Sequence, residues 1–134
     1  MKKYIFQTTI FVLVLLTQSS CRGSTSTTPT PTETTPKLSQ QNPHIRGVIQ
    51  EIYSQNEIVS GFFVEGKKES DTSYDKAHVG IDQNTQVFKK QGDKYVIATV
   101  SDLQVGQNVE ILFIGPIQTS YPVQARALEI VITK

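Results

Sequence analysis

The sequence predicts an all-β domain at residues 44–134, folded as a small OB-like β-barrel, closed or partly open. Short runs of β-branched and aromatic residues alternate with turn residues at intervals of roughly 8–15 residues. No stretch of this region shows the apolar period of an amphipathic helix. About 90 residues suffice for one modest core. A β-sandwich or roll is the alternative architecture.

The first two predicted strands form a hairpin around a tight turn of polar residues. Gly47 and Gly61 are expected to let these strands bend at the corners of the barrel. The third strand alternates apolar residues with His78 and Gly80, which therefore share its other face. In chain order, the strands are predicted at 44–54, 58–66, 77–82, 86–90, 94–100, 108–114 and 124–133.

One connection has the pattern of a short helical turn, at residues 101–107. Ser101 or Asp102 is expected to cap its start, because a side-chain oxygen there can accept from free backbone N–H groups. Gly106 is expected to end it, since glycine adopts the left-handed conformation at little cost. This turn leads into the strand predicted at 108–114.

The last connection, between Gly115 and Ala127, holds the candidate binding surface. Gly115 and Pro116 are expected to end the preceding strand, because proline cannot donate to a ladder. Pro122 favours an extended Tyr121, whose ring then either plugs one end of the core or faces a ligand. The loop between the last two strands of an OB-like barrel adjoins its usual ligand face. The candidate surface consists of Ser120, Tyr121, Pro122 and Gln124.

The first twenty residues have the layout of a secretory signal peptide, with a signal helix as its expected structure. Lys2 and Lys3 precede an unbroken apolar run at residues 10–16, and small polar residues follow. The run is too short for a transmembrane helix of about 20 apolar residues. We therefore expect residues 1–20 to direct export, with secretion as the alternative to membrane attachment.

Cys21 is the only cysteine, and it directly follows the predicted signal peptide. The stretch "TQSSC" resembles a bacterial lipobox, with Gln18 where Leu or Val is usual. Lipidation of Cys21 would attach the protein to the extracytoplasmic face of a membrane, since each buried methylene contributes about 0.8 kcal/mol. Residues 21–43 are rich in Thr, Ser, Pro and Gln, which predicts a disordered linker, or stalk.

The charge of the predicted domain argues against a nucleic-acid partner. Residues 44–134 carry nine Lys or Arg and eleven Asp or Glu, which gives a net charge of −2. Nucleic-acid-binding domains normally show a basic excess. An envelope protein or polymer is the expected partner besides the membrane.

No group of residues in the sequence predicts a catalytic site or a cofactor. His44 is expected to be exposed and mobile at the linker junction, whereas His78 lies on the polar face of a strand. A small hydrolase or metal-dependent enzyme using His78 or Ser120 is the alternative, but no nucleophile elbow supports it. The acidic run of Glu65, Glu69, Asp71 and Asp75 has interleaved lysines, so we expect a solvated loop and no metal site.

Several stretches resemble the YobA-type family of small bacterial lipoproteins and secreted proteins, a domain of unknown function. They are "IRGVIQEI", "FFVEG" and "DLQVGQNVEILFIGPIQTSYPVQARALEIVI", together with the lipoprotein-like leader. The most specific part is "SYPVQ", residues 120–124, which corresponds to an SYPxQ motif. The family's strand before this loop often carries Trp, which this chain lacks. The resemblance implies fold and location and no particular chemistry.

Overall fold

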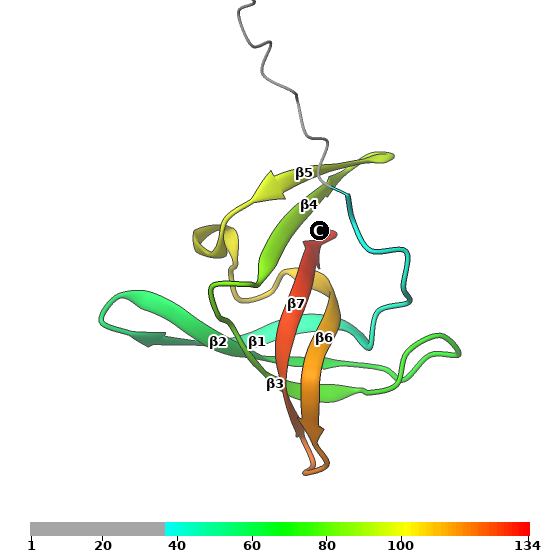
Figure 1. The fold of residues 1–134 in the computed structure, drawn as a ribbon, viewed down its shortest axis with the longest axis vertical. Coiled ribbons are helices and arrows are strands. Elements are labelled where there is room, and N and C mark those ends of the chain that lie inside the picture. The colour runs from blue at the N-terminus through cyan, green and yellow to red at the C-terminus, as the bar shows by residue number, and fades with distance from the viewer. Residues whose placement is uncertain (1–36) are drawn as a thin grey trace, which may run out of the picture. The chain divides into compact units, whose positions relative to one another are not determined.

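The computed structural model describes residues 37–134, in which seven β-strands follow the predicted order (Figure 1). The predicted signal peptide, Cys21 and the predicted linker up to residue 36 lie outside the described residues. The elements are β1 (Ile45–Gln55), β2 (Ile58–Gly66), β3 (Lys76–Gly80), β4 (Gln86–Gln91), β5 (Lys94–Ala98), the 3-10 helix η1 (Val100–Asp102), β6 (Asn108–Gln118) and β7 (Val123–Ile132).

Five of the strands close a β-barrel. The sheet has the order β3-β2-β1-β6-β7-β4-β5, and an additional pairing of β3 with β7 joins its first strand back to the fifth. This closing pair is parallel, whereas the other pairings among the five barrel strands are antiparallel. A closed five-stranded barrel confirms the predicted OB-like fold over the sandwich alternative.

The β4–β5 hairpin lies outside this barrel and extends one end of β7. β4 pairs parallel with β7 from Gln86, opposite Glu129, to Lys89, opposite Ile132. β3 pairs with the other end of β7, where Ala77 lies opposite Val123. Figure 1 accordingly shows β4 and β5 at the end of β7 remote from the β6–β7 turn.

Alternate residues of the five barrel strands fill its interior, as the period of two in the sequence predicts. Each large aliphatic side chain that is fully buried contributes about 1.5–3 kcal/mol. Among the described residues, the largest that are fully buried are Phe62, Ile45, Ile49, Ile111, Ile130, Ile132, Val64, Val79 and Val109.

Gly47 and Gly66 lie opposite each other on β1 and β2, where the facing backbone leaves no room for a Cβ atom. A Cβ atom on Gly66 would overlap the carbonyl oxygen of Arg46, and one on Gly47 would lie 2.5 Å from the carbonyl oxygen of Glu65. Gly47 thus permits close approach of the strands. The two register shifts of β1 lie further along, at Gln50 between Ile49 and Glu51 and directly after Tyr53.

β6 is longer than predicted, because Gly115 and Pro116 do not end it. The strand continues to Gln118, with a register shift against β7 after Ile114. Gly115 absorbs the irregularity with a φ of 76°, in the left-handed region that glycine tolerates. β6 and β7 therefore form a long hairpin, whose turn contains a cis peptide bond between Tyr121 and Pro122.

The predicted helical turn is shorter than expected and starts earlier. η1 covers only Val100–Asp102, and its start is fixed from Thr99, whose backbone N–H and side-chain hydroxyl both donate to the Asp102 carboxylate. The N-cap residue is therefore Thr99, and Asp102 caps the helix from position N3. Within residues 37–134, no helix is long and apolar enough to cross a membrane.

Residues 37–43, the end of the predicted linker, run alongside the barrel without regular secondary structure. The backbone N–H of Ser39 donates to both carboxylate oxygens of Glu129, each at 3.1 Å. Only 9% of the Glu129 surface is exposed, so this N–H partners a charge that would otherwise be costly to bury. The chain therefore reaches the barrel at the β4 end of β7.

Replacing Gly66 with Ala should lower the free energy of unfolding by about 2–3 kcal/mol, because the new methyl group meets rigid backbone. For a domain of this size, thermal unfolding should start roughly 10–20 °C lower. Gly80→Ala is the matched control: its Cβ would lie 3.6 Å from the nearest atom, so it should change stability by under about 0.5 kcal/mol. Equal melting temperatures for the two variants would contradict the close-approach argument.

Candidate functional site

Two rows of residues cross the outer face of the barrel, one from β1 to β7 and one from β2 to β6. Residues paired in register on neighbouring strands point to the same face of a sheet. One row runs from Tyr53 through Gly61 and Gly80 to Arg126. The adjacent row runs from Phe63 through His78 and Gln124 to Gln118 on β6. Side chains from five strands thus meet on one surface.

A groove of about 400 Å³ opens where the first row lacks side chains. Its floor includes Gly61 and Gly80, which lie next to each other on β2 and β3. The aromatic and imidazole rings come from β1 and β3, and the amide and guanidinium groups come from the β6–β7 hairpin. The full lining is Tyr53, Ser60, Gly61, His78, Val79, Gly80, Pro116, Gln118, Gln124, Ala125 and Arg126.

The two floor glycines differ in what they do for the backbone. A Cβ on Gly61 would lie 2.5 Å from the carbonyl oxygen of Val79, so glycine is needed there for strand pairing. A Cβ on Gly80 would make only ordinary contacts, 3.6 Å from Cγ of Arg126. Gly80 also has no positive φ. The fold therefore does not require glycine at Gly80, whose missing side chain keeps the groove open.

A hydrogen-bonded pair of rings forms the wall beside this floor. The hydroxyl of Tyr53 lies 3.0 Å from Nδ1 of His78, and the two ring centroids are 5.9 Å apart. The centroid of the Phe63 ring also lies 5.0 Å from that of His78. Burial, with a smaller contribution from Glu51, raises the pKa of Tyr53. Tyr53 is thus protonated at neutral pH and can donate to an unprotonated Nδ1.

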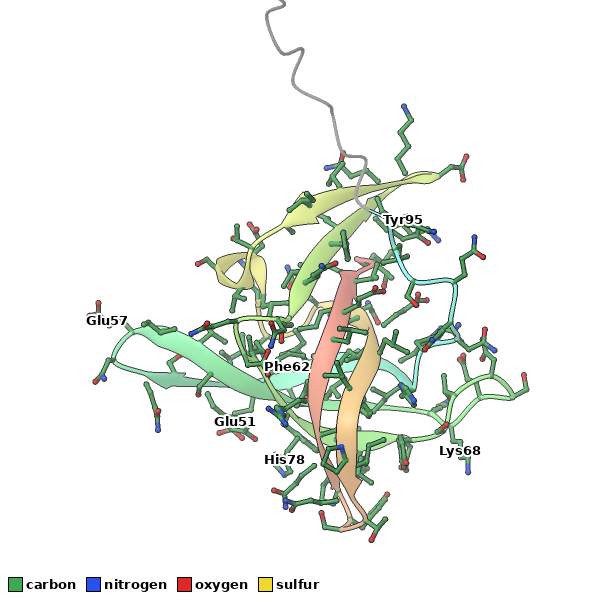
Figure 2. The ribbon with its side chains drawn as sticks, in the orientation of Figure 1. Glu51, Glu57, Phe62, Lys68, His78 and Tyr95 are labelled. Atoms are coloured by element: carbon green, nitrogen blue, oxygen red, sulfur yellow. The ribbon has the colours of Figure 1, made fainter. Side chains whose placement is uncertain are left out.

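Of the four residues predicted as a binding surface, only Gln124 lines the groove. The others lie in the β6–β7 turn, where the Ser120 hydroxyl donates to the carbonyl of Pro122 at 2.7 Å. The Gln124 amide approaches Ser120 Oγ at 3.4 Å and so joins the turn to the groove wall. Figure 2 shows His78 at the end of the barrel near this turn, remote from Tyr95 on β5.

Tyr121 neither plugs the core nor covers the groove, because 72% of its surface is exposed. Its hydroxyl donates to Oδ2 of Asp75 at 2.9 Å, which ties the hairpin turn to the segment before β3. This hydrogen bond to a carboxylate raises the pKa of Tyr121, since a phenolate there would face a second negative charge. Tyr121 therefore braces the hairpin that carries Gln118 and Gln124.

A family profile described as "Protein of unknown function (DUF3221)" matches residues 50–134. The chain belongs to this family. Neither the curated proteins nor the solved structures contained a match. Every residue that lines the groove lies within the part of the chain that the DUF3221 family covers, whereas Cys21 and His44 lie before it.

His44 is ordered, so the expectation of an exposed and mobile residue is wrong. The backbone N–H of Phe113 donates to His44 Nδ1 at 3.0 Å, and the two rings stack with centroids 5.3 Å apart. The backbone carbonyl of His44 also accepts from Ser73 and Tyr74. His44 thus fixes the start of β1 against β6, and the DUF3221 match begins just after it.

Three carboxylates of the acidic run, those of Glu65, Glu69 and Asp71, pair with cations of the protein itself. Arg46 makes a bidentate contact with Asp71 at 2.7 Å and also bonds Glu69 and Glu110. Asp71 is the main cause of a raised pKa at Arg46, and Arg46 in turn lowers the pKa of Asp71. Lys76 pairs with Glu65 at 2.7 Å. Within residues 37–134, no group of three or more His, Cys, Asp or Glu is arranged to hold a metal ion.

The structure does not bring His78 and Ser120 together as a catalytic pair. Among the described hydrogen bonds, His78 meets Tyr53, whereas Ser120 meets Pro122 and Gln124. A base must lie within hydrogen-bond reach of its nucleophile, and usually of an orienting carboxylate. Among the described hydrogen bonds of His78, none joins it to Ser120 or to a carboxylate.

Sequence reasoning missed Tyr53, Gln118 and Arg126 as site residues. Each was placed in a predicted strand or its flank, but nothing local in the sequence shows that β3 pairs with β7. The alternation of the third strand did place His78 and Gly80 on one outward face. The alternation of the third strand, together with the pairing of β3 with β2 and β7, would have located the groove.

Replacing Asp75 with Asn should lower the pKa of Tyr121 toward the ordinary tyrosine value, because the carboxamide cannot repel a phenolate. In the unaltered protein, the stabilisation from this bond is complete below the ordinary tyrosine pKa. It is lost as the pH rises through the higher pKa of the folded state. An NMR titration of the tyrosine rings measures the pKa of Tyr121 in the unaltered protein and in the Asp75→Asn variant.

Tyr53 is the internal control in this titration. Its raised pKa comes from burial and Glu51, so Asp75→Asn should leave it unchanged. A Tyr121 titration that is the same in both proteins would contradict the described hydrogen bond.

Proposed function

We propose that this protein is a non-catalytic binding module, and that the groove over Gly61 and Gly80 is its ligand site. The observation that carries the proposal is Gly80. Neither its backbone conformation nor its neighbours require glycine, yet a side chain there would fill the groove. Aromatic surface beside a few convergent polar groups is the usual composition of a ligand site.

The β6–β7 hairpin would act as a preorganised rim. It is tied to the barrel through Tyr121 and Asp75, while Gln124 pairs in register with His78. Groups held by strands and by supporting hydrogen bonds lose little entropy when a ligand binds. The candidate surface predicted from the sequence thus supports the groove more than it contacts the ligand.

The same proposal places the protein at the extracytoplasmic face of a bacterial membrane. Its supports are the signal-like residues 1–20, the lipobox-like stretch ending at Cys21 and the Thr- and Pro-rich composition of residues 21–43. The same proposal includes a relationship to the YobA-type lipoproteins. In it, residues 120–124 are the SYPxQ motif of that family. The DUF3221 match alone gives a domain of unknown function.

Replacing Gly80 with Leu should abolish ligand binding and leave the fold intact. Its side chain would project into the groove against the flexible Arg126, so stability should change by under about 1 kcal/mol. The readout is photo-crosslinking in intact cell envelopes, with a photoreactive residue in place of Gln118 in the full-length protein. We expect an adduct that disappears when Gly80→Leu is added.

The control carries the photoreactive residue in place of Gln86, an exposed residue of β4 outside the groove. It should not give the same adduct. An adduct that survives Gly80→Leu, or the absence of any adduct from Gln118, would refute the proposed site.

Replacing Cys21 with Ser should release the full-length protein from membranes into the soluble fraction, because the acylated thiol would be gone. Fractionation followed by immunoblotting measures this release, with Ser20→Ala as a neighbouring control that keeps the cysteine. Unchanged membrane association of the Cys21→Ser protein would overturn the lipid anchor.

A further inference from the structure

The two walls of the groove differ in chemistry. The wall from β1 and β3 presents the rings of Tyr53 and His78, with Phe63 packed behind. The second wall, from the β6–β7 hairpin, presents the exposed amides of Gln118 and Gln124 and the guanidinium of Arg126, and it meets the first wall where Gln124 lies beside His78. One wall therefore offers flat apolar surface, and the other offers planar hydrogen-bonding groups.

The groove carries little net charge. Arg126 is its only lining residue with a permanent charge, and its guanidinium lies 3.5 Å from a carboxylate oxygen of Asp82. A strongly polyanionic ligand would need several cations along its path. The lysines of the β4–β5 hairpin, Lys89, Lys90 and Lys94, do not line the groove. The charge thus favours a neutral ligand or one with isolated charges.

The size of the groove argues against a globular partner. A standard protein interface buries about 800 Å² on each side. A volume of about 400 Å³ instead lies in the range of small-ligand sites, roughly 300–1,000 Å³. A short segment of a chain-like molecule fits this space better than the surface of a folded protein.

We infer that the groove binds a sugar chain, a neutral or weakly charged glycan of the cell envelope; this inference rests on the proposed binding function. A pyranose ring has apolar C–H faces and a rim of hydroxyl groups. Its face suits the Tyr53 ring, and its hydroxyls suit amides that both donate and accept. Gly80 leaves the floor free, so a sugar ring can lie between the walls.

The test is a depletion assay of the full-length protein, kept in detergent, on insoluble cellulose, chitin and purified peptidoglycan. We expect retention on at least one of these polymers and competition by soluble oligosaccharides of the same sugar. Gln124→Ala should weaken retention about 3–10-fold, the value of one or two hydrogen bonds. Tyr53→Ala should weaken it about 10-fold, and Gly80→Leu should abolish it.

Gln86→Ala is the matched control for Gln124→Ala, since both are exposed glutamines on strands and only Gln124 lines the groove. It should change retention by less than about twofold. Gln124→Ala keeps the test valid even where Tyr53→Ala lowers stability. Immobilised heparin is added as a polyanionic matrix. Retention on heparin and on none of the other polymers, lost on adding salt, would show charge-driven binding and overturn the glycan assignment.

The two proposals fail in different ways. No retention on any of the polymers, together with a Gly80-dependent adduct at Gln118 in envelopes, would refute the sugar chain and leave the binding site standing. No retention and no adduct would refute both. Retention that is equal in Gln124→Ala, Gly80→Leu and Gln86→Ala would show binding elsewhere on the protein and overturn the inference.

Discussion

The parallel pairing of β3 with β7 is the constraint on which the rest of the molecule depends. Four in-register positions, from Ala77 opposite Val123 to Gly80 opposite Arg126, convert an open sheet into a barrel. Closure gives the apolar face of β3 a covered interior, and removes a free edge that could pair with another chain. On the outside, the same register sets His78 beside Gln124. The pairing of β3 with β7 therefore builds the core on the inner face of the barrel and the groove on its outer face.

Much of the fold was predictable because the relevant signals are local. Alternating apolar residues located all seven strands, and turn residues located the hairpins, including the one at Asn56 and Glu57. The end of β6 was not predictable in this way. Gly115 and Pro116 normally end a strand, but the partner strand β7 continues to pair beyond them and overrides that local preference.

The site was less predictable, because its residues meet only through long-range pairing. Tyr53 and Arg126 are separated by most of the domain, and their approach depends on the strand order β1, β2, β3, β7. His44 is a second residue whose surroundings could not be predicted from the local sequence. Its position beside a low-complexity segment suggested exposure, whereas packing on Phe113 orders it. Local composition does not report such contacts.

The bond from Ser39 to Glu129 has a consequence for how the groove is presented. Glu129 lies on the part of β7 that pairs with β4, whereas Gln124 and Arg126 lie on the part that pairs with β3. The chain therefore enters the barrel near the end of β7 that pairs with β4, the end that Figure 1 shows remote from the β6–β7 turn. The groove residues Gln124 and Arg126 lie on the other part of β7. None of residues 37–43 lines the groove, so the chain enters the barrel without obstructing the site where we propose that a ligand binds.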